Sequence, residues 1–167
     1  MPTISSDEIV HRLLREDDEV RRALRDRFGE RIVNRDGEID RKAVAEIVFR
    51  DRRSLAWLES LLHPPVVREY LAWRDALRAK PDPPALCATE VPLLYEVGGD
   101  TRFDAVVVVT APPELRRARA RTSVDDRSER LIPDEEKAKR ADFVYVNDGT
   151  LDDLDEFVSG VVAKLRS

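Results

Sequence analysis

A carboxylate stands at the first strand-to-helix junction of the chain. Asp7 follows the short apolar-leaning run at residues 2–4 and lies in the first turn of a predicted helix. A carboxylate held at the end of a strand could accept a proton from a substrate hydroxyl, which is general-base chemistry. The alternative is that Asp7 only complements the positive end of the helix macrodipole. The residues alone leave both roles open.

Two further groups of polar residues follow apolar runs. In Glu-Val-Pro-Leu-Leu-Tyr-Glu, Glu90 and Glu96 flank a proline-kinked apolar segment that could line a ligand cleft or simply pack beneath a helix. Asn147, in Asn-Asp-Gly, could offer a donor and an acceptor to a purine edge, although a plain turn would read the same. We interpret His63 as a capping or packing histidine, because no Ser or Cys nucleophile pattern accompanies it.

Residues 116–140 are rich in arginine, with acidic residues that nearly balance the charge. Planar guanidinium groups offer directed donors, so this segment could be a lid that closes over phosphates. A solvated, mobile surface segment would have the same composition. The pattern does not separate these interpretations.

Composition narrows the class of protein. The 167 residues suffice for one domain with a real core, and the net charge of −5 argues against a general nucleic-acid binder. A single cysteine, Cys87, excludes an internal disulfide and fits a reducing compartment. Apolar runs are far shorter than the roughly 18 residues of a membrane span. We therefore expect a cytoplasmic protein without nucleic-acid or membrane partners; nothing predicts its oligomeric state.

The hydrophobic period predicts helices over residues 6–79. Ser5 and Glu8 have the spacing of a capping box, and Gly29 and Asp40 read as a helix stop and a helix cap. Pro64-Pro65 is expected to break this stretch and a new helix to start after it. Apolar positions that share predicted helix faces are Val20, Leu24, Phe28, Val44, Ile47, Val48, Leu55, Leu58, Leu61, Leu62, Val67, Leu71 and Leu77.

After residue 80 the spacing of the apolar residues changes from one typical of helices to one typical of strands. Nearly continuous apolar runs at 85–91, 103–110 and 143–148 predict strands covered on both faces, as in parallel sheets. Helices are predicted after Thr110 and after the cap Thr150, the last with Leu151, Leu154, Val158, Val161 and Leu165 on one face. Alternating strands and helices indicate a doubly wound, three-layer α/β sheet with the helices of 6–79 as an insertion.

Taken in order, these segments resemble the dephospho-CoA kinase family. The segments are ISSDEIVHRLL, LLHPPV, EVPLLYE, VVVVTAPPELRRARAR and RADFVYVNDGT, and the resemblance covers residues 3–166. It implies a P-loop-kinase-like parallel sheet in a single domain. The core would comprise residues 1–8 and 81–167, the CoA-binding helical insertion residues 9–80, and the lid residues from about 121 to 138.

The resemblance also implies roles. Asp7 falls where the family places the carboxylate that activates the ribose 3′-hydroxyl of dephospho-CoA, while Ser5 stands where many members have another Asp. Arg121 and Arg130 are the best candidates for phosphate-binding lid arginines, and Asn147 and Gly149 match the region near the adenine of ATP. Residues on the dephospho-CoA-binding motifs are His63, Pro64, Glu90, Pro92, Leu93, Leu94 and Glu96.

One departure from the family is large. The printed sequence contains no Gly-x-x-x-x-Gly-Lys-Ser/Thr loop, which in the family follows a first strand and precedes the ISSDE position. We expect that this first, central strand and its loop, roughly 25–30 residues for a βα unit, are absent from the sheet.

Three functions fit these observations. The first is ATP- and Mg²⁺-dependent phosphorylation of dephospho-CoA by the complete protein. The second is a non-catalytic remnant of the family, without a P-loop, that binds CoA precursors. The third is another small phosphoryl-transfer kinase, for example one that acts on nucleosides.

The first function predicts that the reading frame upstream of Met1 encodes a glycine-rich stretch ending in Lys-Ser or Lys-Thr. Sequencing the genomic DNA around the start codon checks this. An upstream frame without such a stretch would favour the non-catalytic alternative.

Overall fold

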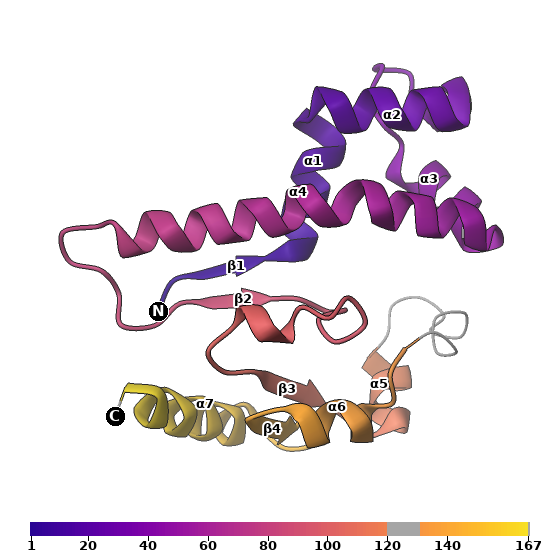
Figure 1. Cartoon of the computed structure of the whole chain (residues 1–167). Helices are drawn as coiled ribbons and strands as arrows, with labels where there is room; N and C mark the ends of the chain where they lie inside the picture. Colours follow the sequence, from indigo (N-terminus) through magenta and orange to yellow (C-terminus); the bar gives the residue numbers. More distant parts are fainter. Residues whose placement is uncertain (120–130, 167) are drawn as a thin grey trace. The chain divides into compact units, whose positions relative to one another are not determined.

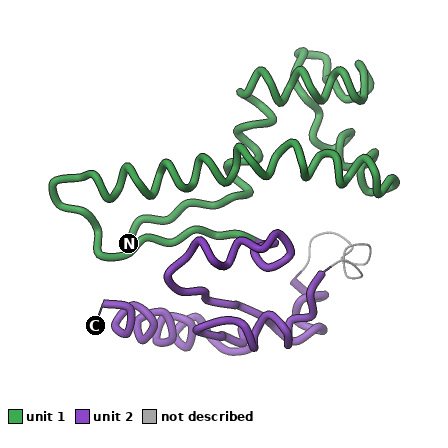
Figure 2. Tube along the Cα trace, viewed as in Figure 1, with its two compact units in different colours: residues 1–91 green, residues 92–167 purple. Residues whose placement is uncertain are grey.

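The computed structural model describes residues 1–119 and 131–166 (Figure 1). The chain falls into two compact units, residues 1–91 and 92–167 (Figure 2). Each unit contains one pair of parallel strands, β1 with β2 and β3 with β4. The predicted α/β class with parallel strands is therefore confirmed.

The first unit is mostly helical. Its strands are β1 (Thr3–Ser5) and β2 (Ala88–Glu90), which pair in parallel. Between them lie the helices α1 (Ser6–Glu16), α2 (Asp18–Phe28), the 3₁₀ helix η1 (Gly29–Ile32), α3 (Arg41–Arg50) and α4 (Arg52–Arg78). The helical region predicted over residues 6–79 is confirmed.

Apolar burial holds these helices together. Val20, Leu24 and Phe28 are buried along one face of α2, as their spacing predicts. The Phe28 ring meets Trp57 of α4 edge to face at 5.4 Å. Gly29 then ends α2 with a φ of 70°, a left-handed conformation that glycine adopts without steric cost.

The predicted break at Pro64-Pro65 is wrong, because α4 runs through both prolines as one helix of 27 residues. A proline inside a helix removes a backbone hydrogen bond and crowds a carbonyl, at a cost of about 3 kcal/mol or more. Tertiary packing offsets that cost: Leu62, Pro65 and Val66 are buried, and α4 contacts both α1 and α3. The proline φ is itself helical, so packing decides the outcome.

Helix caps are only partly as predicted. Ser5 is the N-cap of α1, but its side chain makes no capping hydrogen bond, so the predicted Ser5–Glu8 capping box is wrong. Ser5 is also the last residue of β1, and its pairing with Glu90 fixes the backbone there. Asp40 does cap α3, accepting hydrogen bonds from the backbone N–H groups of Lys42 (2.9 Å) and Ala43 (3.2 Å).

The second unit carries the other strand pair. Its described elements are η2 (Asp100–Arg102), β3 (Val107–Thr110), α5 (Pro113–Arg119), α6 (Asp134–Arg140), β4 (Phe143–Val146) and α7 (Leu151–Arg166). The strands predicted at 103–110 and 143–148 are present over 107–110 and 143–146, but the predicted cover on both faces is wrong, because alternate valines of each strand are exposed: Val107, Val109, Val144 and Val146. Helix α7 contacts β4, and the ring centroids of Phe157 and Tyr145 lie 4.9 Å apart.

Reciprocal capping occurs at α7. The Thr150 hydroxyl accepts a hydrogen bond from Asp153 N (3.2 Å), and the Asp153 carboxylate accepts from Thr150 N (2.7 Å), so the predicted Thr150 cap is confirmed. Of the apolar face predicted on this helix, Val161 is buried whereas Leu151 is 82% exposed. None of the helices within 1–119 and 131–166 has the length and apolar character needed to cross a membrane.

The cap of α4 gives a pH-dependent stability. The Asp51 carboxylate accepts hydrogen bonds from the Ser54 hydroxyl (2.5 Å) and the Arg53 N–H (3.1 Å), and these, the hydroxyl first, lower its pKa below 3.8. A lowered folded-state pKa stabilises the protein above the unfolded pKa, and the effect is lost as pH falls through the folded value.

Asp51→Ala should therefore reduce the free energy of unfolding at neutral pH, and the difference from the wild type should shrink below about pH 4. Urea unfolding followed by circular dichroism at several pH values measures this. The control is Asp82→Ala in the exposed proline-rich loop, for which we expect no such difference. A difference that stays constant with pH would contradict a role for the ionised cap.

Candidate functional site

In the first unit, one group of candidate residues lies where β1 and β2 end. Their parallel register pairs Ser5 with Glu90, so both strands finish at the same edge. Asp7 follows two residues later in the first turn of α1. Ligands of open parallel sheets bind beyond the carboxyl ends of the strands. The structure thus brings two residues predicted for the site, Asp7 and Glu90, to one edge of the first unit.

The Asp7 side chain is exposed and accepts no hydrogen bond from any described residue. The start of α1 concentrates negative charge, with Glu8 beside Asp7, at the positive end of the helix dipole. A carboxylate without a protein partner keeps its oxygens available for a substrate hydroxyl. The arrangement permits general-base chemistry, although it is equally compatible with an interaction with the helix dipole alone.

His63 and Pro64 lie in the middle of α4, His63 half-buried and Pro64 exposed. Helix α4 packs against α1. Within the described part of the chain, no hydrogen bond or ion pair joins His63 to Asp7 or Glu90. The structure therefore places these two predicted residues on the helical part of the first unit, not in direct contact with the strand edge.

A tight turn follows β2 and opens the second unit. Gly98 N donates to Tyr95 O (3.1 Å) and Gly99 N to Leu94 O (2.8 Å). A Cβ on Gly99 would lie 3.2 Å from the Leu94 carbonyl oxygen and 2.9 Å from its side chain, so only glycine fits without a shift. Three residues predicted to contact substrate form the start of this turn: Pro92, Leu93 and Leu94.

Glu96, in the same turn, has a charged partner within the protein. Its side chain is 14% exposed; Oε1 forms an ion pair with Lys137 Nζ of α6 (2.6 Å) and accepts a hydrogen bond from the Ile132 N–H (3.2 Å). The second oxygen, Oε2, is buried and has no hydrogen-bond partner among the described residues. The carboxylate is therefore directed at α6.

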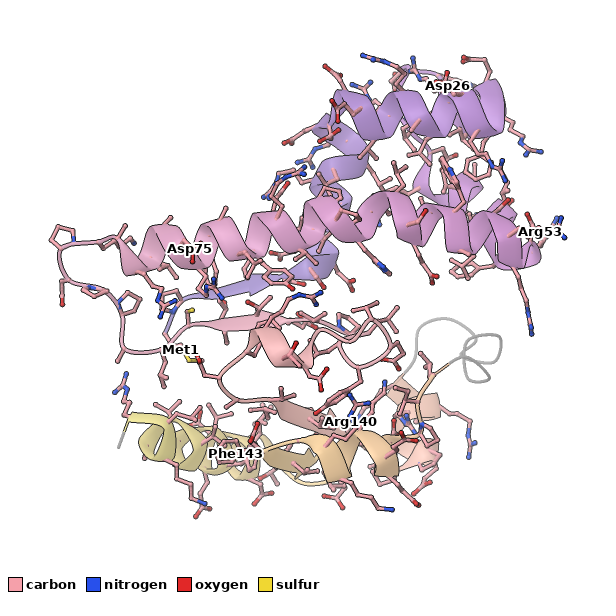
Figure 3. All side chains as sticks on the ribbon, in the orientation of Figure 1. Met1, Asp26, Arg53, Asp75, Arg140 and Phe143 are labelled. Atoms are coloured by element: carbon pink, nitrogen blue, oxygen red, sulfur yellow. The ribbon has the colours of Figure 1, made fainter. Side chains whose placement is uncertain are left out.

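Tyr95 and Asp100 make a neighbouring contact with α6. The Arg140 guanidinium lies 4.3 Å from the Tyr95 ring centroid and donates to Asp100 Oδ2 at 3.0 Å (Figure 3). Burial raises the pKa of the Tyr95 phenol, and the charge of Asp100 raises it further against the opposing effect of Arg140. Tyr95 and Glu96, which are successive residues of the turn, thus both contact basic side chains of α6.

In the second unit, another group of candidate residues lies at the carboxyl ends of β3 and β4. Thr110 ends β3, and its carbonyl accepts from Asn147 N (2.7 Å) just after β4. The Asn147 carbonyl accepts from the Arg119 guanidinium (3.1 Å), whereas its side-chain amide has no partner within residues 1–119 and 131–166. That amide is free to bind a polar ligand edge.

Sequence reasoning missed a cluster at this edge. The Asp134 carboxylate accepts a hydrogen bond from the Thr110 hydroxyl (3.1 Å) and forms an ion pair with the Arg116 guanidinium (2.8 Å). The sequence showed that Thr110 ends an apolar run and that Arg116 belongs to an arginine-rich helix. Nothing in the spacing of these residues from Asp134 indicates that the three meet.

Gly149, predicted to lie near adenine, has a structural reason to be glycine. A Cβ there would lie 2.5 Å from Asp153 Oδ2, the oxygen that caps α7. Hydrogen bonds from Thr150, its hydroxyl first, lower the pKa of Asp153. The cap alone accounts for this glycine, so the structure neither supports nor opposes a ligand role.

Two predicted residues, Arg121 and Arg130, lie outside the described residues, as do residues 121–130 of the predicted lid. The rest of that segment, residues 131–138, leads into and includes most of α6. Among the described residues, no group of three or more His, Cys, Asp or Glu side chains could hold a metal ion.

Comparison with known proteins gives a consistent result. A sequence profile of the dephospho-CoA kinase family matches residues 1–153. The dephospho-CoA kinase of Protochlamydia amoebophila is 36% identical over 98% of this chain and 83% of that protein. The enzyme of Thermosynechococcus vestitus is 35% identical over 92% of this chain and 77% of its own length.

Solved structures agree. The crystal structure of TT1252 from Thermus thermophilus matches 99% of this chain and 85% of its own, with a TM-score of 0.74 and 35% identity. The dephospho-CoA kinase from Campylobacter jejuni matches the same shares with a TM-score of 0.71 and 25% identity. The resemblance expected from the sequence is confirmed, and the chain belongs to the dephospho-CoA kinase family.

Proposed function

We propose that this protein transfers the γ-phosphoryl group of ATP to the ribose 3′-hydroxyl of dephospho-CoA, giving CoA in the last step of its biosynthesis. Family membership supports a kinase that uses ATP. The observation that carries the assignment of residues is the register of Ser5 with Glu90, which puts Asp7 at the strand edge with a carboxylate that has no hydrogen-bond partner among the described residues.

In the proposed reaction, Asp7 accepts the proton of the 3′-hydroxyl as its oxygen attacks the γ-phosphorus. The bond from that phosphorus to the bridging oxygen breaks, and ADP leaves with the electron pair. Arg121 and Arg130 stabilise the charge on the transferring group, a role that rests on the resemblance alone. The protein contributes mainly position and electrostatics, since the chemistry needs little else.

Contacts to the acceptor are proposed for six residues that match the family motifs: His63, Pro64, Glu90, Pro92, Leu93 and Leu94. The half-buried His63 lies on a rigid helix, and the closed turn after β2 fixes the backbone around Leu93 and Leu94. Pre-organised surfaces of this kind lower the ordering cost of binding. Glu96 also matches the motif, but its carboxylate is paired with Lys137, so no acceptor contact is assigned to it.

Contacts to ATP are proposed for Asn147 and Gly149. The unpartnered Asn147 amide at the end of β4 supports the first of these. Mg²⁺ stays a prediction from the family: the described residues include no group of three or more His, Cys, Asp or Glu side chains that could hold a metal ion. The steps above are therefore assigned to this chain's side chains without it.

We also propose that β3 belongs to a larger, P-loop-kinase-like sheet with a further central strand, divided into the core, insertion and lid expected from the sequence. Among the described residues β3 pairs only with β4. The carbonyls of Val106 and Thr110 accept hydrogen bonds from the β4 side, so the alternate residues Val107 and Val109 direct their main-chain groups to the other edge. Their side chains are 43% and 58% exposed.

This free edge predicts fast amide exchange at Val107 and Val109 in the 167-residue chain, because neither N–H has a backbone acceptor there. Amide hydrogen exchange by NMR measures both rates. The control amides are Val108 and Thr110 of the same strand, which should be protected by β4. Equal protection of all four amides would contradict an open edge.

Asp7→Asn should lower kcat for phosphorylation of dephospho-CoA at least about 10²-fold, the low end for loss of a general base. The assay uses the protein expressed from its whole reading frame, with nucleosides and nucleoside monophosphates as competing acceptors. The matched control is Glu8→Gln, which removes a charge from the adjacent exposed residue and should leave kcat within about twofold.

An unchanged rate in Asp7→Asn would remove Asp7 from the mechanism. Preference for a nucleoside acceptor would replace dephospho-CoA as the substrate. Binding of dephospho-CoA in a calorimeter without turnover would favour the non-catalytic alternative.

A further inference from the structure

Helix α6 is held in place by charge. None of its seven residues is buried, so apolar burial contributes little to its position. Instead Asp134, Lys137 and Arg140, spaced three apart and hence on neighbouring positions of one face, each bind a partner elsewhere in the second unit. The partners come from separate elements: Arg116 of α5, Glu96 of the turn after β2 and Asp100 of η2.

The Lys137–Glu96 pair is the best shielded of the three. Its side chains are 15% and 14% exposed, against 38% and 27% for Arg140 and Asp100 and 49% and 39% for Arg116 and Asp134. Exposed pairs are screened by water and salt and contribute little, whereas a shielded pair interacts more strongly. The docking of α6 therefore depends most on Lys137 and Glu96.

The same carboxylate also fixes the chain that enters α6. Glu96 Oε1 accepts a hydrogen bond from the Ile132 N–H (3.2 Å) in addition to its ion pair with Lys137 Nζ (2.6 Å). One side chain thus holds both the segment before the helix and the helix itself. Its second oxygen is buried without a partner, so Glu96 has no spare oxygen that is accessible to a ligand.

The position of α6 also determines where side chains lie at the edge of β3. Asp134, the first residue of α6, accepts a hydrogen bond from the Thr110 hydroxyl and forms an ion pair with the Arg116 guanidinium. A shift of α6 would move this carboxylate and release both groups. Thr110 in turn bonds through its carbonyl to Asn147, so the cluster borders the residues proposed to bind ATP.

We infer that Glu96 and Lys137 are positioning residues: their ion pair docks α6, and through Asp134 it holds Arg116 and Thr110 at the nucleotide-side edge of β3. The inference rests on the proposed function for its kinetic consequence. It differs from the substrate contact that the family resemblance implies for Glu96. Arg116 gains a role as a cation oriented by its ion pair with Asp134, and its planar guanidinium could also donate to a phosphate-bearing ligand.

The kinetic test compares Glu96→Gln, Lys137→Met and the double variant with the wild type in the protein from the whole reading frame. Each single variant should raise KM for ATP about tenfold while KM for dephospho-CoA stays within about twofold. The double variant should be less impaired than Lys137→Met alone, because that single change leaves a shielded carboxylate uncompensated. Lys139→Met, an exposed lysine of the same helix, is the matched control and should change neither constant.

A second measurement does not need activity. Hydrogen exchange of the peptide spanning residues 131–140 should rise in Glu96→Gln and Lys137→Met and should not rise in Lys139→Met. Added salt should narrow the differences only slightly, because the pair is shielded.

Three outcomes would overturn the inference. A rise in KM for dephospho-CoA with KM for ATP unchanged would make Glu96 a direct acceptor contact. A lower melting temperature with both KM values unchanged would leave the pair purely structural. Unchanged exchange at residues 131–140 would show that the pair does not dock α6. If the wild type fails to phosphorylate dephospho-CoA, the proposed function fails, while the exchange experiment still decides the docking.

Discussion

Parallel strand pairing is the constraint on which the candidate site depends. Parallel strands end at the same edge, so pairing Ser5 with Glu90 fixes where Asp7 emerges. The pairing of Thr110 with Val146 does the same for Asn147 in the second unit. In both units the register converts residues far apart in the chain into neighbours at one edge, where ligands of parallel sheets bind.

The two units are stabilised differently. The helices of the first unit bury a continuous set of apolar side chains, with Ile9, Leu24 and Ile32 essentially inaccessible to solvent. Burial of this kind is non-directional, and its free energy is large enough to offset the cost of two prolines inside α4. In the second unit α6 buries no residue and is located by ion pairs, which are directional and sensitive to single substitutions. Ion pairs thus place α6 near the β3 edge.

Local sequence rules succeeded where local physics decides. Asp40 and Thr150 cap the helices expected of them, and Gly29 ends α2, because cap chemistry involves residues only a few positions apart. The same rules were wrong at Ser5, whose backbone is fixed by a strand partner, and at Pro64-Pro65, where packing from other helices outweighs a local penalty.

The sequence by itself determined the class of fold, the order of its elements and the family, because hydrophobic period and ordered motifs survive without knowledge of contacts. It also named Asp7, Glu90 and Asn147 as polar residues that follow strands. Only the tertiary structure decided that Glu96 binds Lys137 and that Asp134 joins Thr110 to Arg116. Those contacts join residues of separate elements. Strand register and packing bring the elements together, and no local sequence pattern encodes either.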